Sequence, residues 1–408
     1  MRQRGARSLV RGRRRRRLAL VTPWPPEQSG VADYSLRLAT ALAEHVDVEV
    51  VVSGPVADFA VAPARRMKVV SSLSRDMLKR LRWSDRVLYC MGNSSFHLHV
   101  YELLRQHPGA VLLHDAQLTG FYGWYAGREQ PDDPLGRLVE RVEQDYGALV
   151  PPDELRTAPL SWERRAALGI YLTAEIQRYA QQVFVHSQFA QQVVERDGRV
   201  AGHGAPVSVM PFGMPPPSPD GARSSAGQPP LVVHMGVVGE IKGIAVLIEA
   251  FAQVAARHPG AKLLLAGPVD DAAIAHWRSF AAREAPSATI ELLGRVSVER
   301  WQDLLAAADV AVQLRVVSNG EASAAVCDCI AAGVPTVVTD LGWMSELPES
   351  AVARVAPGVA PALLAGQIGE LIADLPRRAL LSAGALACAA DLSFERVATD
   401  YIAALGLA

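Results

Sequence analysis

A carboxylate beside a helix start built from small residues is the feature of this sequence that most suggests chemistry. In the segment SNGEASAAVCDCIAAGVPTVVTD, residues 318–340, Glu321 follows an Asn-Gly turn, and Ser323 and Ala324 begin an alanine-rich helix. Small side chains leave the first N–H groups of a helix open, and these groups bind anions such as phosphates. The segment therefore predicts an anion site next to Glu321, with helix capping as the structural alternative.

A lysine in a glycine-rich turn is the second candidate for an anion site. The segment HMGVVGEIKG, residues 234–243, places Lys242 near an expected helix start. A lysine there neutralises a phosphate as a point charge, and a solvated lysine in a simple turn is the alternative. The spacing of Gly236 and the glycines that follow fits neither the dinucleotide fingerprint nor the P-loop. The turn therefore indicates phosphate binding of another type.

The elements that position these residues alternate between short apolar strands and helices. The pattern predicts strands at 17–22, 47–54, 86–92, 110–115 and 182–190, and a long helical stretch from about 134 to 182. After a Pro-, Gly- and Ser-rich segment at 211–230, the alternation restarts with PLVVHMG, AKLLLAG, ATIELLG, DVAVQLR and PTVVTD. Two such runs predict two doubly wound α/β domains, with ligand at the carboxyl ends of the strands, in the cleft between them.

Composition limits the class of protein. The chain has 408 residues, of which 50% are hydrophobic and 20% charged, which favours two or three globular domains. No apolar run approaches the roughly 18 residues of a membrane span. The four scattered cysteines favour reduced thiols and a cytoplasmic location.

An arginine-rich start contrasts with the rest of the chain. Residues 1–17 hold nine arginines and no acid, whereas the net charge of the whole chain is −1. The body is therefore acidic, which disfavours nucleic acid as a partner. A disordered tail is one interpretation of residues 1–17, and a basic arm for weak peripheral association with anionic membrane is the other.

Four motifs, in their order and spacing, resemble one enzyme family. SGVADYS, MGVVGEIKG, LLGRV followed by LLAAADVAV, and GEASAAVCDCIAAGVPTVVTDLG are similar to the retaining glycosyltransferases of family 4. YCMGNSSFH and LLHDAQL resemble one branch of it. The family has the GT-B architecture of two Rossmann-like domains, and the resemblance extends over nearly the whole chain from about residue 18. It implies the following organisation: a tail (1–17), an acceptor-side domain (18–212), an exposed linker (213–230), a nucleotide-sugar domain (231–385) and a C-terminal helix (386–408) that crosses back.

The resemblance implies roles for individual residues. Glu321 would contact the transferred sugar, and the N–H groups of Ser323, Ala324 and Ala325 would hold the diphosphate. Lys242 would neutralise the phosphates, and His114 would lie near sugar and acceptor. Gly30 and Gly236 would let their loops approach the diphosphate, and Asn93, His97 and Asp115 would lie on the acceptor side.

Two positions depart from the family pattern. The second glutamate of the usual pair, which binds ribose, is replaced by Asp328, with six residues between it and Glu321. The arginine expected after the first C-terminal strand is replaced by Val237. Either Arg315 or Arg295 supplies the missing guanidinium, or the backbone and Lys242 alone contact the phosphates. These two departures are compatible with a weakened or altered catalyst.

The sequence predicts neither a metal nor a cofactor. It contains no Asp-x-Asp, and its His and Cys residues lack metal-ligand spacing. The expected partners are a nucleotide sugar, as substrate, and a hydroxyl acceptor. A sugar-nucleotide epimerase, a phosphorylase and a catalytically silent sugar-nucleotide-binding module on the same architecture are the alternatives.

Overall fold

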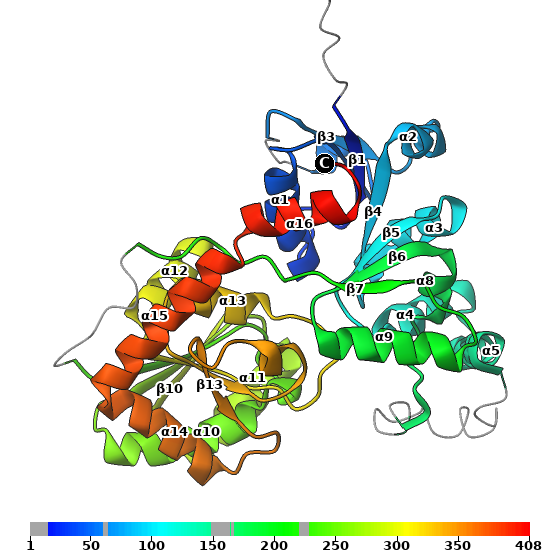
Figure 1. Cartoon of the computed structure of the whole chain (residues 1–408). Helices are drawn as coiled ribbons and strands as arrows, with labels where there is room; N and C mark the ends of the chain where they lie inside the picture. The colour runs from blue at the N-terminus through cyan, green and yellow to red at the C-terminus, as the bar shows by residue number, and fades with distance from the viewer. Residues whose placement is uncertain (1–14, 60–63, 148–163, 165–166, 220–227) are drawn as a thin grey trace, which may run out of the picture.

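The computed structural model describes residues 15–59, 64–147, 164, 167–219 and 228–408. Residues 1–14 of the expected tail lie outside these ranges, as does part of the expected helical stretch. Two α/β lobes make up the described chain (Figure 1). No helix within these ranges combines the length and the apolarity that a membrane crossing requires.

The N-terminal domain is built on a seven-stranded sheet in the order β3-β2-β1-β4-β5-β6-β7. Every neighbouring pair in it is parallel. Its central strands, such as GAVLL of β5, are buried throughout, as expected where helices cover both faces. The strands are β1 (Arg17–Val21), β2 (Asp47–Val52), β3 (Met67–Ser71), β4 (Arg86–Met91), β5 (Gly109–Leu113), β6 (Ala180–Val185) and β7 (Val207–Val209).

The C-terminal domain repeats the design with a six-stranded parallel sheet in the order β10-β9-β8-β11-β12-β13. In both sheets the strand order reverses next to the first strand, between β1 and β4 and between β8 and β11. Such switch points are where doubly wound sheets bind ligands. The strands are β8 (Leu231–Met235), β9 (Lys262–Ala266), β10 (Thr289–Gly294), β11 (Val310–Gln313), β12 (Thr336–Thr339) and β13 (Val352–Val355).

Helices and short 3-10 turns connect the strands. In the N-terminal domain they are α1 (Gly30–Leu42), η1 (Val56–Asp58), α2 (Met77–Trp83), η2 (Ser95–His97), α3 (Leu98–Gln106), α4 (Thr119–Glu129), α5 (Pro134–Tyr146), α8 (Ala174–Tyr179) and α9 (Gln188–Val200). In the C-terminal part they are η4 (Glu240–Lys242), α10 (Ile244–Arg257), α11 (Asp271–Glu284), α12 (Val298–Ala307), α13 (Ala324–Ala331), η5 (Gly342–Glu346), α14 (Pro361–Ala373), α15 (Leu375–Asp391) and α16 (Phe394–Ala404).

The predicted pair of doubly wound domains is confirmed, but several elements differ from the prediction. Strands β3, β7 and β13 were not expected, and each is an edge strand of three to five residues. The expected helical stretch is also interrupted, because α5 ends at Tyr146, before Gly147 with a φ of 62°, and β6 begins at Ala180.

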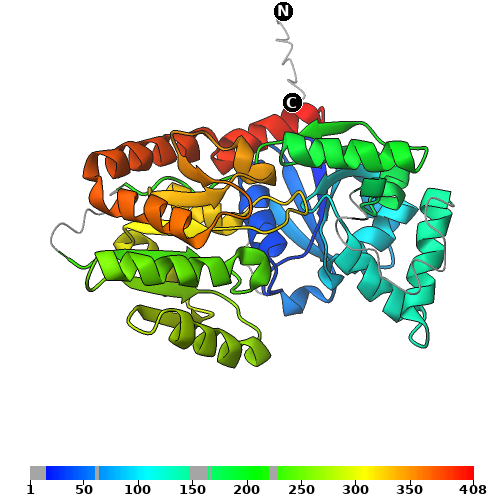
Figure 2. The ribbon, with the colours of Figure 1, turned by 90° about the horizontal axis from the view of Figure 1, so that it is seen from below.

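The end of the chain returns to the N-terminal domain. Helix α16 packs against α1, and Figures 1 and 2 both place it, in red, on the N-terminal lobe. The core at this junction joins Tyr34 of α1, Phe212 and Phe394 in one buried cluster. The expectation of an exposed linker from residue 213 is wrong at its beginning. Met214 is fully buried and its N–H donates to the carbonyl of Leu392 at 2.8 Å, because the chain here pairs with the residues just before α16.

A carboxylate of the C-terminal domain caps a helix of the N-terminal domain. Glu346 of η5 accepts hydrogen bonds from the N–H groups of Gln188 and Phe189, both at 2.8 Å. These are the first two residues of α9, where Ser187 also accepts from Ala190 at 3.0 Å. A carboxylate at a helix N-terminus satisfies unpaired donors and complements the helix dipole. This contact therefore ties the two domains together.

We expect Glu346→Ala to lower the free energy of unfolding by about 1 kcal/mol, the usual cost of a lost helix cap. The measurement is chemical denaturation followed by circular dichroism. Glu349→Ala is the matched control, because the Glu349 side chain is 91% exposed and its ion pair with Arg354 lies at the surface. Equal midpoints for the two variants would show that the interdomain cap contributes nothing.

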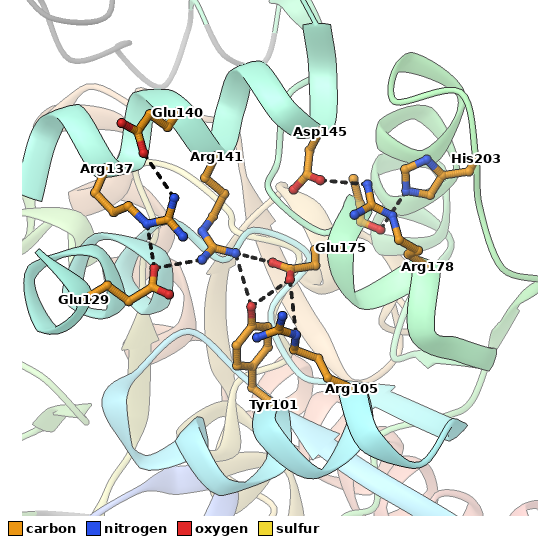
Figure 3. Close-up of polar contacts among 11 residues, drawn as sticks. Tyr101, Arg105, Glu129, Arg137, Glu140, Arg141, Asp145, Glu175, Arg178 and His203 are labelled. Atoms are coloured by element: carbon orange, nitrogen blue, oxygen red, sulfur yellow. Dashed lines mark hydrogen bonds and ion pairs between the residues drawn. The ribbon is translucent and has the colours of Figure 1, made fainter.

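A buried ion network holds the helices on the outer side of the N-terminal domain (Figure 3). Arg141 of α5 pairs with Glu175 of α8, and both side chains are less than 10% exposed. The hydroxyl of Tyr101 donates to Glu175 at 2.8 Å and accepts from Arg141 at 3.1 Å. Arg141 also contacts Glu129 of α4 at 3.0 Å. Since a buried charge needs such partners, the network fixes α3, α4, α5 and α8 relative to one another.

Candidate donor site between the domains

The loop that carries Glu321 lies directly against the N-terminal domain. The N–H of Ala116, after β5, donates to the carbonyl of Asn319 at 2.7 Å. A Cβ on Gly320 would lie 2.5 Å from the Cβ of Ala116, and the φ of Gly320 is 79°. Only glycine fits at this point. The loops that follow β5 and β11 are thereby brought together.

Glu321 is held by a guanidinium and by its own loop. Its carboxylate forms an ion pair with Arg315, which follows β11, and accepts from the N–H of Asn319 at 2.6 Å. Ser318 is a further donor at 3.5 Å. The Glu321 side chain is 16% exposed and that of Arg315 8%. The cap of α13 comes instead from Ser323, whose Oγ accepts from Val326 at 3.4 Å, so capping of α13 does not account for Glu321.

The start of α13 meets the glycine turn after β8. Ala324 and Ala325 are its first residues, and the N–H groups there have no acceptor within the helix. A Cβ built on Gly236 would lie 3.5 Å from the Cβ of Ala325. The two segments in which the sequence predicts phosphate binding are therefore neighbours in space.

Three charged groups from both domains influence one another here. Burial, and then the charge of Arg315, lower the pKa of Lys242 to about 7, while Asp115 acts in the opposite direction. Burial raises the pKa of Asp115 to about 6. The hydrogen bond from the N–H of Asn93 and the charges of Arg315 and Lys242 act in the opposite direction. The pKa of Arg315 falls to about 10, again through burial. Lys242 and Arg315 are thus two desolvated cations whose charges act on each other, a combination suited to an anionic ligand.

His114 follows β5 and directly precedes Asp115. It is 6% exposed, and its Nδ1 is 3.2 Å from Nε2 of His186. The ring of Tyr34 lies edge-on, with centroids 5.1 Å apart. Burial and the neighbouring histidines hold its pKa well below the usual value, so the imidazole is neutral. Its Nε2 has no hydrogen-bond partner among the described residues.

The other acceptor-side candidates support the turn after β4. The Oδ1 of Asn93 accepts from the N–H of Phe121 at 2.9 Å, and its own N–H donates to Asp115 at 2.9 Å. His97 is 1% exposed, with Nδ1 3.1 Å from Oγ of Ser94. Asp115 is therefore the one of these three whose charge reaches the C-terminal cations.

Asp328 lies in the middle of α13, and Gly30 is the first residue of α1. Asp328 accepts from Nε1 of Trp301 at 3.2 Å and lies 3.7 Å from a nitrogen of Arg37 on α1. Burial raises the pKa of Asp328, and Arg37 opposes this. Gly30 is the exposed first residue of α1, with open space where a Cβ would lie. A ribose contact by Asp328 remains a prediction, and it would compete with Arg37.

Arg315, and not Arg295, lies beside Lys242. The charge of Arg295 acts on Asp33 of α1, whose pKa is raised by burial and lowered by Arg37 and Arg295. Sequence reasoning missed His186 and Asn319. The available signal for His186 was its place at the end of a strand, as for His114. Across the described residues, no group of three or more His, Cys, Asp or Glu side chains could hold a metal ion.

Known proteins with similar structure identify the architecture. HepE of Anabaena in complex with UDP superposes with a TM-score of 0.63, at 17% identity over 96% of this chain and 99% of that one. Sucrose-phosphate synthase of Thermosynechococcus elongatus gives 0.64, at 18% identity over 95% and 97%. The chain has the GT-B fold. WaaG, a glycosyltransferase involved in lipopolysaccharide biosynthesis, gives 0.60, at 14% identity over 95% and 99%.

The C-terminal domain also resembles a known protein family in sequence. Residues 229–374 match the model of glycosyl transferases group 1. Comparison of the sequence with curated proteins finds no match. The matched range contains Gly236, Lys242, Arg315, Glu321 and α13. The model and the fold together support a place in the GT-B glycosyltransferase superfamily.

Proposed function

We propose that the protein is a retaining glycosyltransferase of the family 4 type that moves a sugar from a nucleoside diphosphate to a hydroxyl acceptor. The observation that carries the proposal is the convergence of Lys242, Arg315 and the start of α13 next to Glu321. The group 1 match covers these residues, and HepE, which shares the fold, was solved in complex with UDP and UDP-glucose.

The arrangement suits departure of an anionic leaving group. The bond from the anomeric carbon to the diphosphate breaks, and its electron pair leaves on the phosphate oxygen. Lys242, Arg315 and the N–H groups of α13 stabilise that charge. The acceptor hydroxyl attacks the anomeric carbon from the same face, and its proton passes to the departing phosphate oxygen. In this proposal Lys242 and Arg315 supply the positive charge that a metal ion supplies in metal-dependent glycosyltransferases.

The carboxylate of Glu321 stabilises the opposite charge, the positive charge on the sugar. Positive charge develops on the sugar as the leaving group departs, and a nearby carboxylate stabilises it. Arg315 fixes the orientation of Glu321 and is partly neutralised by it. His114 supplies a neutral imidazole on the acceptor side of the same region.

A ligand screen tests this function. Thermal shift against UDP-, GDP-, ADP- and dTDP-sugars should show stabilisation by one nucleotide class, amounting to about 2.7 kcal/mol at a hundredfold excess over Kd. Binding with release of nucleoside diphosphate supports the transferase. Turnover that needs orthophosphate would indicate a phosphorylase, and binding without turnover a silent module. No stabilisation by any of the four would contradict the proposal.

The pKa of Lys242 predicts how donor binding depends on pH. Because its pKa is about 7 in the free protein, Lys242 loses its charge as the pH rises above that value. A bound diphosphate favours the charged form. Affinity for UDP-glucose, tried first because HepE binds it, should therefore fall by up to about tenfold per pH unit above roughly pH 7.5.

Calorimetry across this range measures the effect. UDP-glucose keeps a constant charge there, so that the change reports on the protein. The pH dependence should be nearly absent in Lys242→Ala. An equally steep dependence in that variant would place the titrating group elsewhere.

A further inference from the structure

A second histidine, which neither the motifs nor the proposed chemistry uses, contacts His114. His186 follows β6 and is 4% exposed. Its Nδ1 is 3.2 Å from the carbonyl oxygen of Met210, and its Nε2 is 3.2 Å from Nδ1 of His114. The rings of Phe212 and Tyr34 pack against it, with centroids 4.8 and 5.6 Å away.

The carbonyl of Met210 determines where the protons lie. A carbonyl oxygen only accepts, so Nδ1 of His186 carries the hydrogen. In the neutral ring, Nε2 of His186 is then an acceptor. Nδ1 of His114 must therefore carry a hydrogen and donate to it. That leaves Nε2 of His114 with a lone pair and no hydrogen.

Both rings are neutral in this environment. Burial lowers the pKa of His186 to about 4, and burial also lowers that of His114. The aromatic neighbours prevent either ring from turning freely. Nε2 of His114 is thus a buried acceptor without a partner among the described residues. Most buried polar atoms in proteins have a hydrogen-bond partner, so an unpaired one points to a functional role.

We propose that His186 is a positioning residue, which holds His114 in the Nδ1–H tautomer so that Nε2 accepts a hydrogen bond from a sugar hydroxyl. The choice of hydroxyl rests on the proposed function, whereas the tautomer rests on the contacts alone. A free neutral imidazole prefers the Nε2–H form, which would present a donor to the sugar. His186 therefore reverses the polarity of the group that the substrate meets.

Nitrogen-15 NMR of the imidazoles tests the tautomer directly. The wild-type spectrum should show His114 with a protonated Nδ1 and an unprotonated Nε2, assigned by comparison with His114→Asn. In His186→Leu, which removes the acceptor, the population should move toward Nε2–H. His186→Gln should keep the Nδ1–H form, because its amide offers one acceptor and one donor at a spacing close to that of the two ring nitrogens.

Turnover separates positioning from folding. We expect His186→Leu to lower kcat by about tenfold, the effect of roughly 1.4 kcal/mol, with a smaller change in the KM for the donor. His186→Gln should recover most of that loss. Protonated Nε2 on His114 in the wild-type protein would overturn the proposal, as would a tautomer unchanged in His186→Leu.

The tautomer of His114 and the proposed sugar transfer can be refuted separately. If the leucine variant does not fold, the wild-type and glutamine spectra still decide the tautomer. Absence of sugar transfer in the wild-type protein, with the tautomer as expected, would remove the proposed function and leave the role of His186 intact.

Discussion

Lys242→Ala is expected to weaken nucleoside diphosphate binding by about 1.5–3 kcal/mol, or about ten- to a hundred-and-fiftyfold. Lys242 ends η4, and burial and then the charge of Arg315 lower its pKa to about 7. Gly236 of the same turn lies against Ala325 of α13. A charge in such a place interacts strongly with phosphate. The fold should survive, since the side chain makes no contribution to the buried core.

Calorimetry with UDP, or with the diphosphate that the ligand screen selects, measures this loss. Lys262→Ala is the matched control, because Lys262 is exposed and begins β9, at the amino ends of the parallel strands, whereas Lys242 follows the carboxyl end of β8. It should bind as the wild type does. Unchanged affinity in Lys242→Ala would remove Lys242 from the site.

Glu321→Gln is expected to lower turnover by at least tenfold while leaving diphosphate affinity nearly unchanged. The substitution keeps the size of the side chain and an oxygen that can still accept from Asn319. It removes the charge that we propose faces the sugar, and even about 1.4 kcal/mol of lost transition-state stabilisation gives a factor of ten. Arg315 also loses the negative charge of its partner. The attraction of Arg315 for phosphate is not weakened by this loss.

Single-turnover rates and melting temperatures together test this expectation. Glu349→Gln is the control, since its side chain is 91% exposed on the C-terminal domain. A Glu321→Gln protein that melts earlier but keeps its rate per folded molecule would assign the carboxylate to bracing the 318–321 loop. A stable variant with wild-type turnover would take the carboxylate out of the mechanism.

The buried strands were the most predictable part of the fold. Strands such as β1, β4 and β8 are short apolar runs between turn residues, and their alternation with helices specifies a doubly wound sheet. The edge strands β7 and β13 have only three and four residues, so that pairing and not composition determines them. The burial of Met214 could not be predicted either, because it depends on where α16 returns.

The candidate site was predictable where one segment carries the whole signal. The small residues of α13 and the turn around Lys242 can each be recognised from one continuous segment of the sequence. The contacts of Glu321 with Arg315, and of His114 with His186, join strand ends far apart in the sequence. Such pairs follow from sheet order, which the sequence alone did not supply. The side-chain oxygen of Asn93, a predicted acceptor-side residue, is used at the start of α4.

The central claim is that the Lys242, Arg315 and Glu321 cluster transfers sugar from a nucleotide. Its most direct test is the release of nucleoside diphosphate from UDP-, GDP-, ADP- and dTDP-sugars by the full chain, followed by coupled assay with water or an added glycan as acceptor. We predict slow release from one nucleotide class, lost in both Lys242→Ala and Glu321→Gln and kept in Lys262→Ala. Release that persists unchanged in both site variants, or none from any donor, would contradict the account.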